Sequence, residues 1–529
     1  MERTSPLLAN KNFLYATEFF SGMSIMAVEL GAARLLAPYF SSSQIVWTII
    51  IGTIMIALAL GNVWGGRRAD LDANPAKLYR RLIFAALWIG AIPVLGKYLI
   101  LALAGILIVA IDTNLLIWAA FLSCMAIFVA PLFLLGTVTP SLVKYSTDNL
   151  EHNGQIVGNL NAFNTIGSII GTFLPTFVTI PAVGTAVTFL IFSGVLLLIG
   201  IIYFLSLGVK KFFCAVAVVI FILCGVLGNS NNFAFWEKNL LYEGESIYNY
   251  LQVKETSDKI IFSTNVLFGV QSLKVKNGDL TGMYYDYALA APLLTDGKKI
   301  LILGMGMGTF AEQCRKYFPK SQIVGVEIDE KITALAKKYF ALPEEVEVVT
   351  YDGRAFLQAD ENFYDVILVD AFQDISPPFQ MSSMEFFSLV KSHLKPGGVM
   401  VVNMNMRASG AGNINEYLID TIGKNFSALK IVDASGVTNR ILFAAEDDKI
   451  LNELHARAEN LSDEKLSRLM IHIADTWTTP ALGENILTDD RAAVEILSMR
   501  ALDNFIQQNL QRCKEIYRRE GLDGVLNSF

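Results

Sequence analysis

The stretch Lys299-Ile300-Leu301-Ile302-Leu303-Gly304-Met305-Gly306-Met307-Gly308 decides the fold of the C-terminal half of this chain. Residues 300–303 form a short apolar run, which is typical of a buried parallel strand. The three glycines that follow let the backbone turn sharply and approach a ligand closely. We therefore predict a strand, a tight turn at a binding site and then the N-terminus of a helix.

The residue after these glycines narrows the class of ligand. A dinucleotide-binding loop requires glycine or alanine at position 309, where the helix packs beside a pyrophosphate. Thr309 stands there instead. The loop therefore favours a nucleoside ligand without a pyrophosphate over NAD.

Strand and helix patterns alternate from residue 298 onward, which predicts a parallel sheet in a Rossmann-type α/β domain. The expected strands are 299–303, 322–327, 346–350, 364–370, 399–403 and 440–445. Upstream, short β-type runs at 248–253, 260–262 and 270–275 predict a small antiparallel β domain.

Acidic residues stand at the ends of successive predicted strands. Glu327 lies 23 residues after Gly304, a distance typical of an acid that binds ribose hydroxyls. Asp352-Gly353 follows the third strand, where a carboxylate can accept a hydrogen bond from an adenine amine. Asp370 ends the fourth strand. Ligands of open α/β sheets bind at this carboxyl edge, so we expect one shared nucleoside crevice.

The N-terminal half has the composition of a membrane protein. The chain is 53% hydrophobic and only 17% charged, and its long apolar runs all lie before residue 229. Residues 82–112 read either as a hairpin or as one kinked span, so the expected transmembrane bundle has seven or eight spans. The candidate spans are 13–36, 43–66, 82–95, 98–112, 115–139, 156–180, 185–207 and 212–228.

The Lys/Arg bias predicts the orientation of this bundle. The loop 66–81 is the most basic one and places the N-terminus in the cytoplasm. Eight spans would return the C-terminal half to the cytoplasm, whereas seven, which Lys210 and Lys211 favour, would leave it outside. Because the expected nucleoside ligand is cytosolic, we expect eight spans and a cytoplasmic C-terminal domain.

Polar residues inside the spans have two interpretations. Glu18, Glu29 and Arg34 either hold the bundle together or line a polar cavity. Asn164 and the glycines near it, Gly167 and Gly171, predict a close helix contact.

Other classes of partner are disfavoured by composition. A net charge of −7 argues against nucleic acid. The five cysteines show no paired spacing and the four histidines are scattered, so we expect neither disulfides nor a metal site.

Taken together, these motifs resemble the spermidine synthase (polyamine aminopropyltransferase) family, and more closely its bacterial members fused to an N-terminal multi-span domain. The resemblance rests on Gly61–Asp70 and Asn164–Gly167 in the membrane half, and on the glycine loop, Glu327-Ile328-Asp329, Asp352-Gly353 and Asp370 in the soluble half. It implies a bacterial inner (plasma) membrane protein with domains at 1–230, 231–292 and 293–529.

The resemblance also implies roles for individual residues. Asp370 would be the general base and Tyr284 would orient the amine. The nucleoside would contact Asn249, Gly304, Gly306, Gly308, Glu327, Asp352 and Gly353. The amine substrate would contact Tyr285, Asp286, Asp374 and Pro377.

This chain departs from the family where the amine binds. Met307 replaces the aspartate of the glycine loop, Leu280-Thr281 replaces an Asp-Glu pair, and Gln373 replaces a second acid, although Asp374 follows it. With fewer carboxylates, a cationic amine is held less strongly.

The expected activity is therefore transfer of an aminopropyl group from decarboxylated S-adenosylmethionine to an amine. One alternative is methyl transfer from S-adenosylmethionine to an amine or a membrane-associated substrate. Another, from a different class, is a transporter with a nucleoside-sensing domain. The expected partners are a small amine or lipid headgroup, membrane lipids and a second copy in a homodimer, with no nucleic acid. The segment Thr488–Arg491 reads either as a lid or as the N-cap of a helix over 491–500.

Overall fold

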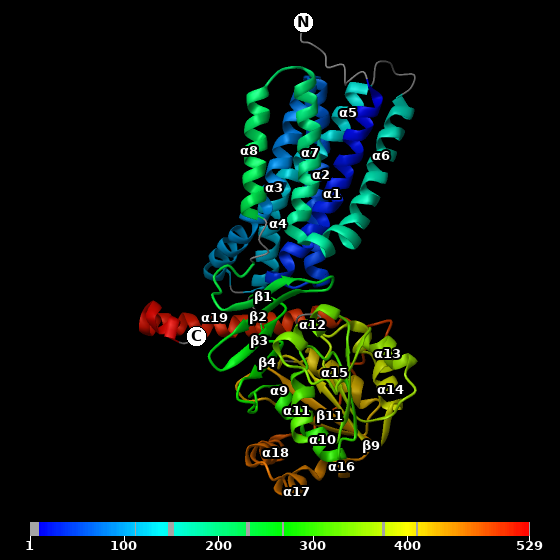
Figure 1. The fold of residues 1–529 in the computed structure, drawn as a ribbon, viewed down its shortest axis with the longest axis vertical. Helices are drawn as coiled ribbons and strands as arrows, with labels where there is room; N and C mark the ends of the chain where they lie inside the picture. Colours follow the sequence, from blue (N-terminus) through cyan, green and yellow to red (C-terminus); the bar gives the residue numbers. More distant parts are fainter. Residues whose placement is uncertain are drawn as a thin grey trace. The chain divides into compact units, whose positions relative to one another are not determined.

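The structure is a computed structural model that describes residues 10–111, 113–146, 153–228, 233–266, 269–372, 376–408 and 411–527. The chain divides into two compact units, Met1–Phe235 and Trp236–Phe529, and each is described here by itself (Figure 1).

The first unit is helical, and many of its helices begin at a side-chain cap. Asn10, Ser43 and Asn74 each accept a hydrogen bond from the first turn of the helix that follows. The helices are α1 (Lys11–Phe40), α2 (Gln44–Leu71), α3 (Pro75–Ala110), α4 (Leu115–Gly136), α5 (Val138–Ser146), α6 (Asn153–Leu174), the π-helical segment η2 (Pro175–Thr179), α7 (Ile180–Ser206) and α8 (Lys211–Gly228).

Six helical stretches in the described part of the chain are long and apolar enough to cross a membrane. The stretch Asn153–Ser206 has 54 residues and contains two long helices, α6 and α7, which η2 joins. Within α7 the backbone is kinked at Gly184, where φ is 81° and ψ is 171°. Between residues 75 and 110 the chain forms one continuous helix, α3, with Pro93 inside it, rather than a hairpin. The described part therefore contains seven long apolar helices.

Helices α1 and α6 pack with almost no side chain between them, as the sequence predicts. A Cβ atom added to Gly167 would lie 2.0 Å from the Phe19 carbonyl oxygen. Glu18 of α1 is fully buried beside this contact, and its Oε1 accepts hydrogen bonds from Thr139 at 2.5 Å and from Asn164 at 2.8 Å. The contacts observed for Glu18 thus hold three helices together.

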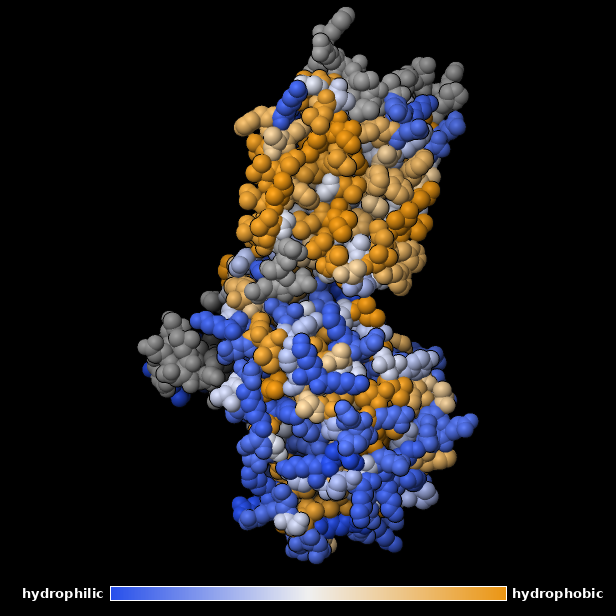
Figure 2. Space-filling view, viewed as in Figure 1, coloured by the Kyte–Doolittle hydropathy of each residue, from blue (hydrophilic) through white to orange (hydrophobic). Residues whose placement is uncertain are grey.

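The two units present different surfaces. The helical unit exposes large apolar side chains along its helices, and its visible face is mostly hydrophobic, whereas the second unit shows a mostly hydrophilic face (Figure 2). Exposed examples on α2 are Met55 and Leu60. A surface of this kind is stable in contact with lipid or another apolar partner, not with water.

The second unit contains two sheets. The small antiparallel sheet has the order β1-β2-β3-β4, and the large sheet has the order β10-β11-β9-β8-β5-β6-β7. The strands are β1 (Leu240–Glu245), β2 (Tyr250–Glu255), β3 (Lys259–Ser263), β4 (Ser272–Val275), β5 (Lys299–Leu303), β6 (Gln322–Glu327), β7 (Glu347–Thr350), β8 (Tyr364–Val369), β9 (Leu394–Asn403), β10 (Ala428–Asp433) and β11 (Arg440–Ala445).

The large sheet is buried on both faces. Ile300 and Ile302 of β5 pack into one hydrophobic cluster, while Leu301 and Leu303 pack into the other, as expected for a parallel strand with period-two side chains. The covering helices are α9 (Tyr284–Ala288), α10 (Ala290–Thr295), α11 (Thr309–Tyr317), α12 (Glu330–Tyr339), α13 (Gly353–Ala359), α14 (Met384–Ser392), α15 (Ile414–Gly423), α16 (Asp448–Asn452), α17 (Leu454–Glu459), α18 (Glu464–Thr476) and α19 (Val494–Asn527), with one 3₁₀ turn, η3 (Phe379–Met381).

The structure differs from the expected organisation in three places. The small sheet shares the core of the large one through Leu251, Val253 and Phe262, and both sheets lie in the unit Trp236–Phe529. Strands β1 and β10 were not predicted from the sequence. Strand β9 starts at Leu394 rather than at the expected residue 399, with a register shift between Tyr364 and Val366 of β8.

Candidate functional site

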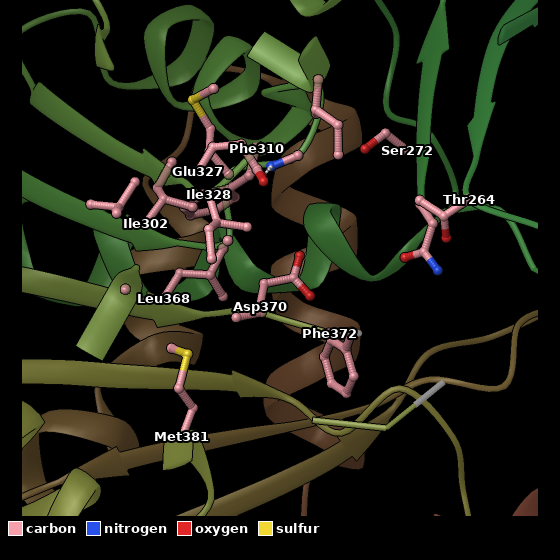
Figure 3. Close-up of a pocket in the computed structure, with 18 of the residues that line it drawn as sticks. Thr264, Ser272, Ile302, Phe310, Glu327, Ile328, Leu368, Asp370, Phe372 and Met381 are labelled. Atoms are coloured by element: carbon pink, nitrogen blue, oxygen red, sulfur yellow. Dashed lines mark hydrogen bonds between the residues drawn. The ribbon is translucent and has the colours of Figure 1, made fainter. Parts of the chain in front are cut away.

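A cavity of about 320 Å³ opens where strands β5, β6, β7 and β8 end. The strand order makes this place the topological switch point of the sheet. The chain runs from β5 outward to β7 and then returns to β8 on the other side of β5. Figure 3 shows side chains from these strand ends, such as Glu327 and Asp370, around one space with Thr264 and Ser272 of the small-sheet region. The predicted shared crevice is thus formed.

The glycine turn forms one wall. Gly304, Gly306 and Gly308 have φ values of 85°, 55° and 79°, a region that residues with a Cβ rarely adopt. At Gly304 space is also limiting, because a Cβ would lie 2.5 Å from the Asp370 carbonyl oxygen. Gly304 and Gly306 line the cavity, whereas Gly308 lies outside its wall as the N-cap of α11.

Glu327 connects the end of β6 to this turn. Its side chain is 7% exposed, and its Oε2 accepts a hydrogen bond from the Gly306 amide at 2.8 Å. Its Oε1 accepts one from the Asp329 amide at 3.1 Å. Burial raises the pKa of Glu327 to about 7, although these hydrogen bonds act in the opposite direction. Glu327 therefore lines the cavity and holds the glycine turn.

The third strand end contributes Asp352 and Gly353. Asp352 caps α13, since its Oδ1 accepts a hydrogen bond from the Ala355 amide at 2.8 Å. Both residues line the cavity, and Met381 lies next to Gly353, since a Cβ added to this glycine would lie 3.2 Å from Met381 Cε. These residues lie at the carboxyl edge of the sheet, as expected, because α13 begins soon after β7 ends.

Asp370 follows β8 and lies at the centre of the site. Tyr284 donates its hydroxyl to Asp370 Oδ2 at 2.5 Å, and Asn403 donates its amide to Oδ1 at 2.8 Å. Burial raises the pKa of Asp370 to about 7, and the two hydrogen bonds oppose that rise. Burial and the neighbouring carboxylate also raise the pKa of Tyr284 well above its usual value. A carboxyl with this pKa can bind an ammonium and accept its proton near neutral pH.

Two further predicted residues line the cavity. Tyr285 donates its hydroxyl to the Gln271 carbonyl at 2.6 Å, and its ring centroid lies 4.1 Å from that of Tyr284. Asn249 is fixed by its backbone, which exchanges hydrogen bonds with Ser246. Tyr285 and Asn249 thus line the same cavity as Asp370.

Two predicted substrate residues do not line the cavity, and a third is not among the described residues. Asp286 is 1% exposed and lies outside the cavity wall, where it accepts hydrogen bonds from the Thr281 hydroxyl, the Gly282 amide and Gln313. Its sequence position predicted an amine ligand, but its contacts are those of a buried structural carboxylate. Pro377 also lies outside the wall, which the neighbouring Pro378 joins. Asp374 lies outside the described residues.

The sequence did not single out Thr264, Ser272 or Phe372, which also line the cavity. Ser272 accepts a hydrogen bond from the Met307 amide at 3.3 Å. Thr264 Oγ1 is buried and has no hydrogen-bond partner among the described residues. Of these three residues, only Phe372 could have been predicted from the sequence, because it comes two residues after the end of the predicted strand 364–370. In the described residues, no group of three or more His, Cys, Asp or Glu side chains could hold a metal ion.

The segment Thr488–Arg491 is neither of the two forms considered from the sequence. It is a tight turn with mutual backbone hydrogen bonds between its ends, and α19 begins later, at Val494. Asp489 accepts two hydrogen bonds from Arg354 of α13, both at 2.6 Å. Arg354 also donates to the carbonyl of Gln380, which lines the cavity. The turn thus fixes two parts of the cavity wall from behind.

Asp489→Asn is expected to weaken nucleoside binding about two- to tenfold, because a bidentate Arg–carboxylate pair is lost behind the wall. Isothermal titration calorimetry with an adenosyl thioether measures this. Asp296→Asn is the matched control, since it removes the Arg457–Asp296 pair (2.9 Å), which does not touch the wall. Equal affinities for the two variants would contradict the prediction.

Comparison with known proteins adds a family resemblance to this geometry. Residues 284–439 match the family described as the Spermine/spermidine synthase domain. A probable polyamine aminopropyl transferase of Bifidobacterium longum is 49% identical over 346 residues, which cover 62% of this chain and 78% of that protein. The polyamine aminopropyltransferase of Chromobacterium violaceum is 36% identical over 111 residues, and these span 20% of this chain and only 42% of that protein.

Solved structures are more distant. A crystal structure of spermidine synthase in complex with the transition-state analogue AdoDATO is 17% identical, with a TM-score of 0.37. The match covers 52% of this chain and 88% of that one.

Proposed function

This chain belongs to the polyamine aminopropyltransferase (spermidine synthase) family and is a transferase, and from that premise we propose that it transfers an aminopropyl group from decarboxylated S-adenosylmethionine to an amine. One observation carries the proposal. The hydrogen-bonded pair Tyr284–Asp370 lines the same cavity as the glycine turn and Glu327, so a proton acceptor lies beside the wall expected to bind the nucleoside.

The chain's residues divide the reaction between binding and proton transfer. The glycine turn, Glu327 and Asp352 hold the nucleoside, and Asp370 with Tyr284 holds the acceptor ammonium. Asp370 takes one proton from the ammonium, and the freed nitrogen lone pair attacks the carbon beside the sulfonium. The new N–C bond forms as the C–S bond breaks, and its electrons stay on sulfur in neutral methylthioadenosine. Because the sulfonium is already a good leaving group, positioning supplies most of the rate.

The acceptor is held by few charges. The carboxylates that line the cavity, within the described residues, are Glu327, Asp352 and Asp370. Met307 stands where the family has an acid, and it is 1% exposed and outside the wall. We therefore propose an acceptor bound through one amine rather than a di-cation held at both ends, and a lipid headgroup amine fits this description.

We also propose that the helical unit anchors the enzyme in the bacterial inner membrane. Seven long apolar helices with exposed apolar side chains support this. Seven crossings would place the N-terminus and the transferase unit on opposite sides. With seven crossings, the Lys/Arg bias of residues 66–81 favours a transferase unit outside the cytoplasm. The donor nucleoside is cytosolic, however, which favours a transferase unit inside the cytoplasm. We give more weight to the supply of the donor, because the enzyme cannot turn over without it.

Reporter fusions test this arrangement. Alkaline phosphatase, which is active only outside, and a fluorescent protein, which matures only inside, are fused in turn after Leu207 and at the C-terminus of the full chain. We expect fluorescence from the C-terminal fusion. Phosphatase activity there would show that the transferase unit faces outward and would overturn the cytoplasmic placement.

The donor is identified by its product. Purified full-length protein in nanodiscs is incubated with each donor and with diamines, monoamines or an aminophospholipid. Methylthioadenosine supports aminopropyl transfer, adenosylhomocysteine indicates methyl transfer, and neither product with any acceptor would reject both. A transporter with a nucleoside sensor would bind nucleoside without turnover. The predicted homodimer is tested on the same sample by mass photometry.

A further inference from the structure

A chain of buried asparagines lies behind Asp370. Strands β8 and β9 are parallel neighbours with Val369 opposite Val402, so the next residues, Asp370 and Asn403, lie side by side. Asn403 Nδ2 donates to Asp370 Oδ1 at 2.8 Å. Asn403 is 4% exposed and does not line the cavity, so it cannot touch a substrate there.

The orientation of this amide is determined by its other contacts. Asn403 Oδ1 accepts hydrogen bonds from the Asn405 backbone amide at 2.9 Å and from Asn439 Nδ2 at 3.0 Å. A backbone N–H can only donate, so the atom facing it must be the oxygen. The nitrogen of Asn403 therefore faces Asp370. Asn439 is itself buried, in the connection between β10 and β11, where its backbone carbonyl accepts a hydrogen bond from the Ala434 backbone amide.

We propose that Asn403, held by Asn439, is a positioning residue that keeps the Asp370 carboxylate ionised and aimed at the acceptor amine. This rests on the proposed function of Asp370 as the proton acceptor. Asn403 does not line the cavity, so it acts only through its hydrogen bond to Asp370.

The electrostatic reason follows from the groups that face Asp370. Burial, and the negative charge of Glu327, both favour the protonated carboxyl. Tyr284 on α9 and Asn403 on β9 each donate a hydrogen bond to one carboxylate oxygen, and both favour the ionised form. Tyr285, also on α9, is neutral near pH 7, because burial keeps its pKa above the usual value. Removing Asn403 leaves Tyr284 as the one donor among these groups.

The experiment compares full-length variants in nanodiscs. Asn403→Leu removes the donor, Asn403→Ser is a smaller replacement in case the first variant does not fold, and Asn439→Leu frees the Asn403 amide. Asn415→Leu is the matched control. Asn415 is also buried, at 1% exposed, and both ends of its amide form hydrogen bonds, to Met406 and Ala408 rather than to Asp370.

Two readouts are used. The acid limb of the kcat–pH profile should move upward by about one pH unit or more in both Asn403 variants, given the usual strength of a hydrogen bond to a charged group. Asn439→Leu should move it in the same direction by less, and Asn415→Leu should not move it. Independently of turnover, difference infrared titration against the Asp370→Asn version of each protein should show the protonated carboxyl persisting to higher pH.

These outcomes separate two failures. If the wild type shows no turnover with any donor, the proposed function fails, while the infrared titration still tests the effect of Asn403 on Asp370. If the wild type turns over and neither the acid limb nor the infrared titration moves in the folded Asn403 variants, the positioning role is wrong. An equal shift in Asn415→Leu would also overturn it, because the effect would then be a general result of destabilisation.

Discussion

Asp370→Asn is expected to lower kcat by about 10²–10⁴-fold while the affinity for an adenosyl thioether stays within about threefold. The asparagine retains the size of the carboxyl and can still contact Tyr284 and Asn403, but it cannot accept a proton from an ammonium. Turnover is measured by the release of the thioether nucleoside, and affinity by calorimetry.

The wild type should also lose activity as the pH falls. Burial raises the pKa of Asp370 to about 7, and only the ionised carboxylate can accept the proton. The rate should therefore fall on the acid side, through pH 7, and this limb should be absent from the residual activity of Asp370→Asn.

Asp365→Asn is the matched control for this prediction. Asp365 lies on the same strand at the opposite edge of the sheet, where it accepts hydrogen bonds from the Lys299 amide and from Lys395. It should retain most of the turnover. Full turnover in Asp370→Asn would show that Asp370 is not the base.

Gly304→Ala is expected to abolish nucleoside binding and to destabilise the transferase unit by about 2–5 kcal/mol. Two costs add at this position. A non-glycine residue in the left-handed region costs about 1–2 kcal/mol, and overpacking typically costs about 1–3 kcal/mol. The added Cβ would lie 2.5 Å from the Asp370 carbonyl oxygen and 2.6 Å from Ala371 Cα, so the end of β8 must move.

Gly397→Ala separates these two costs. Gly397 has a φ of 80°, close to the 85° of Gly304, but no heavy atom lies within 4 Å of its added Cβ. It should show the conformational cost alone, with a smaller fall in melting temperature and unchanged nucleoside affinity. Thermal unfolding and calorimetric titration measure both quantities, and equal behaviour of the two variants would show that the clash at Gly304 is unimportant.

The glycine run and the acids at the strand ends were sufficient to predict which strand ends share one cavity. Parallel strands place their carboxyl ends on one edge, so residues far apart in sequence, such as Gly304 and Asp352, must meet there. The strongly periodic strands β5, β6 and β8 were predicted almost to the residue. Strand β1 was missed because Leu240–Glu245 contains Gly244 and two glutamates, and such composition does not indicate a strand.

What the sequence determined by itself was therefore the local order of strand, turn and acid, because these depend on backbone sterics and side-chain periodicity. Tertiary structure decided which polar side chains share a contact. Asp286 looks like a substrate acid in the sequence, but packing against Gln313 buries it, whereas Asn403 looks like an ordinary strand end until the β8–β9 register brings it to Asp370. Register and packing are set by the whole core, so no single segment of the sequence contains them.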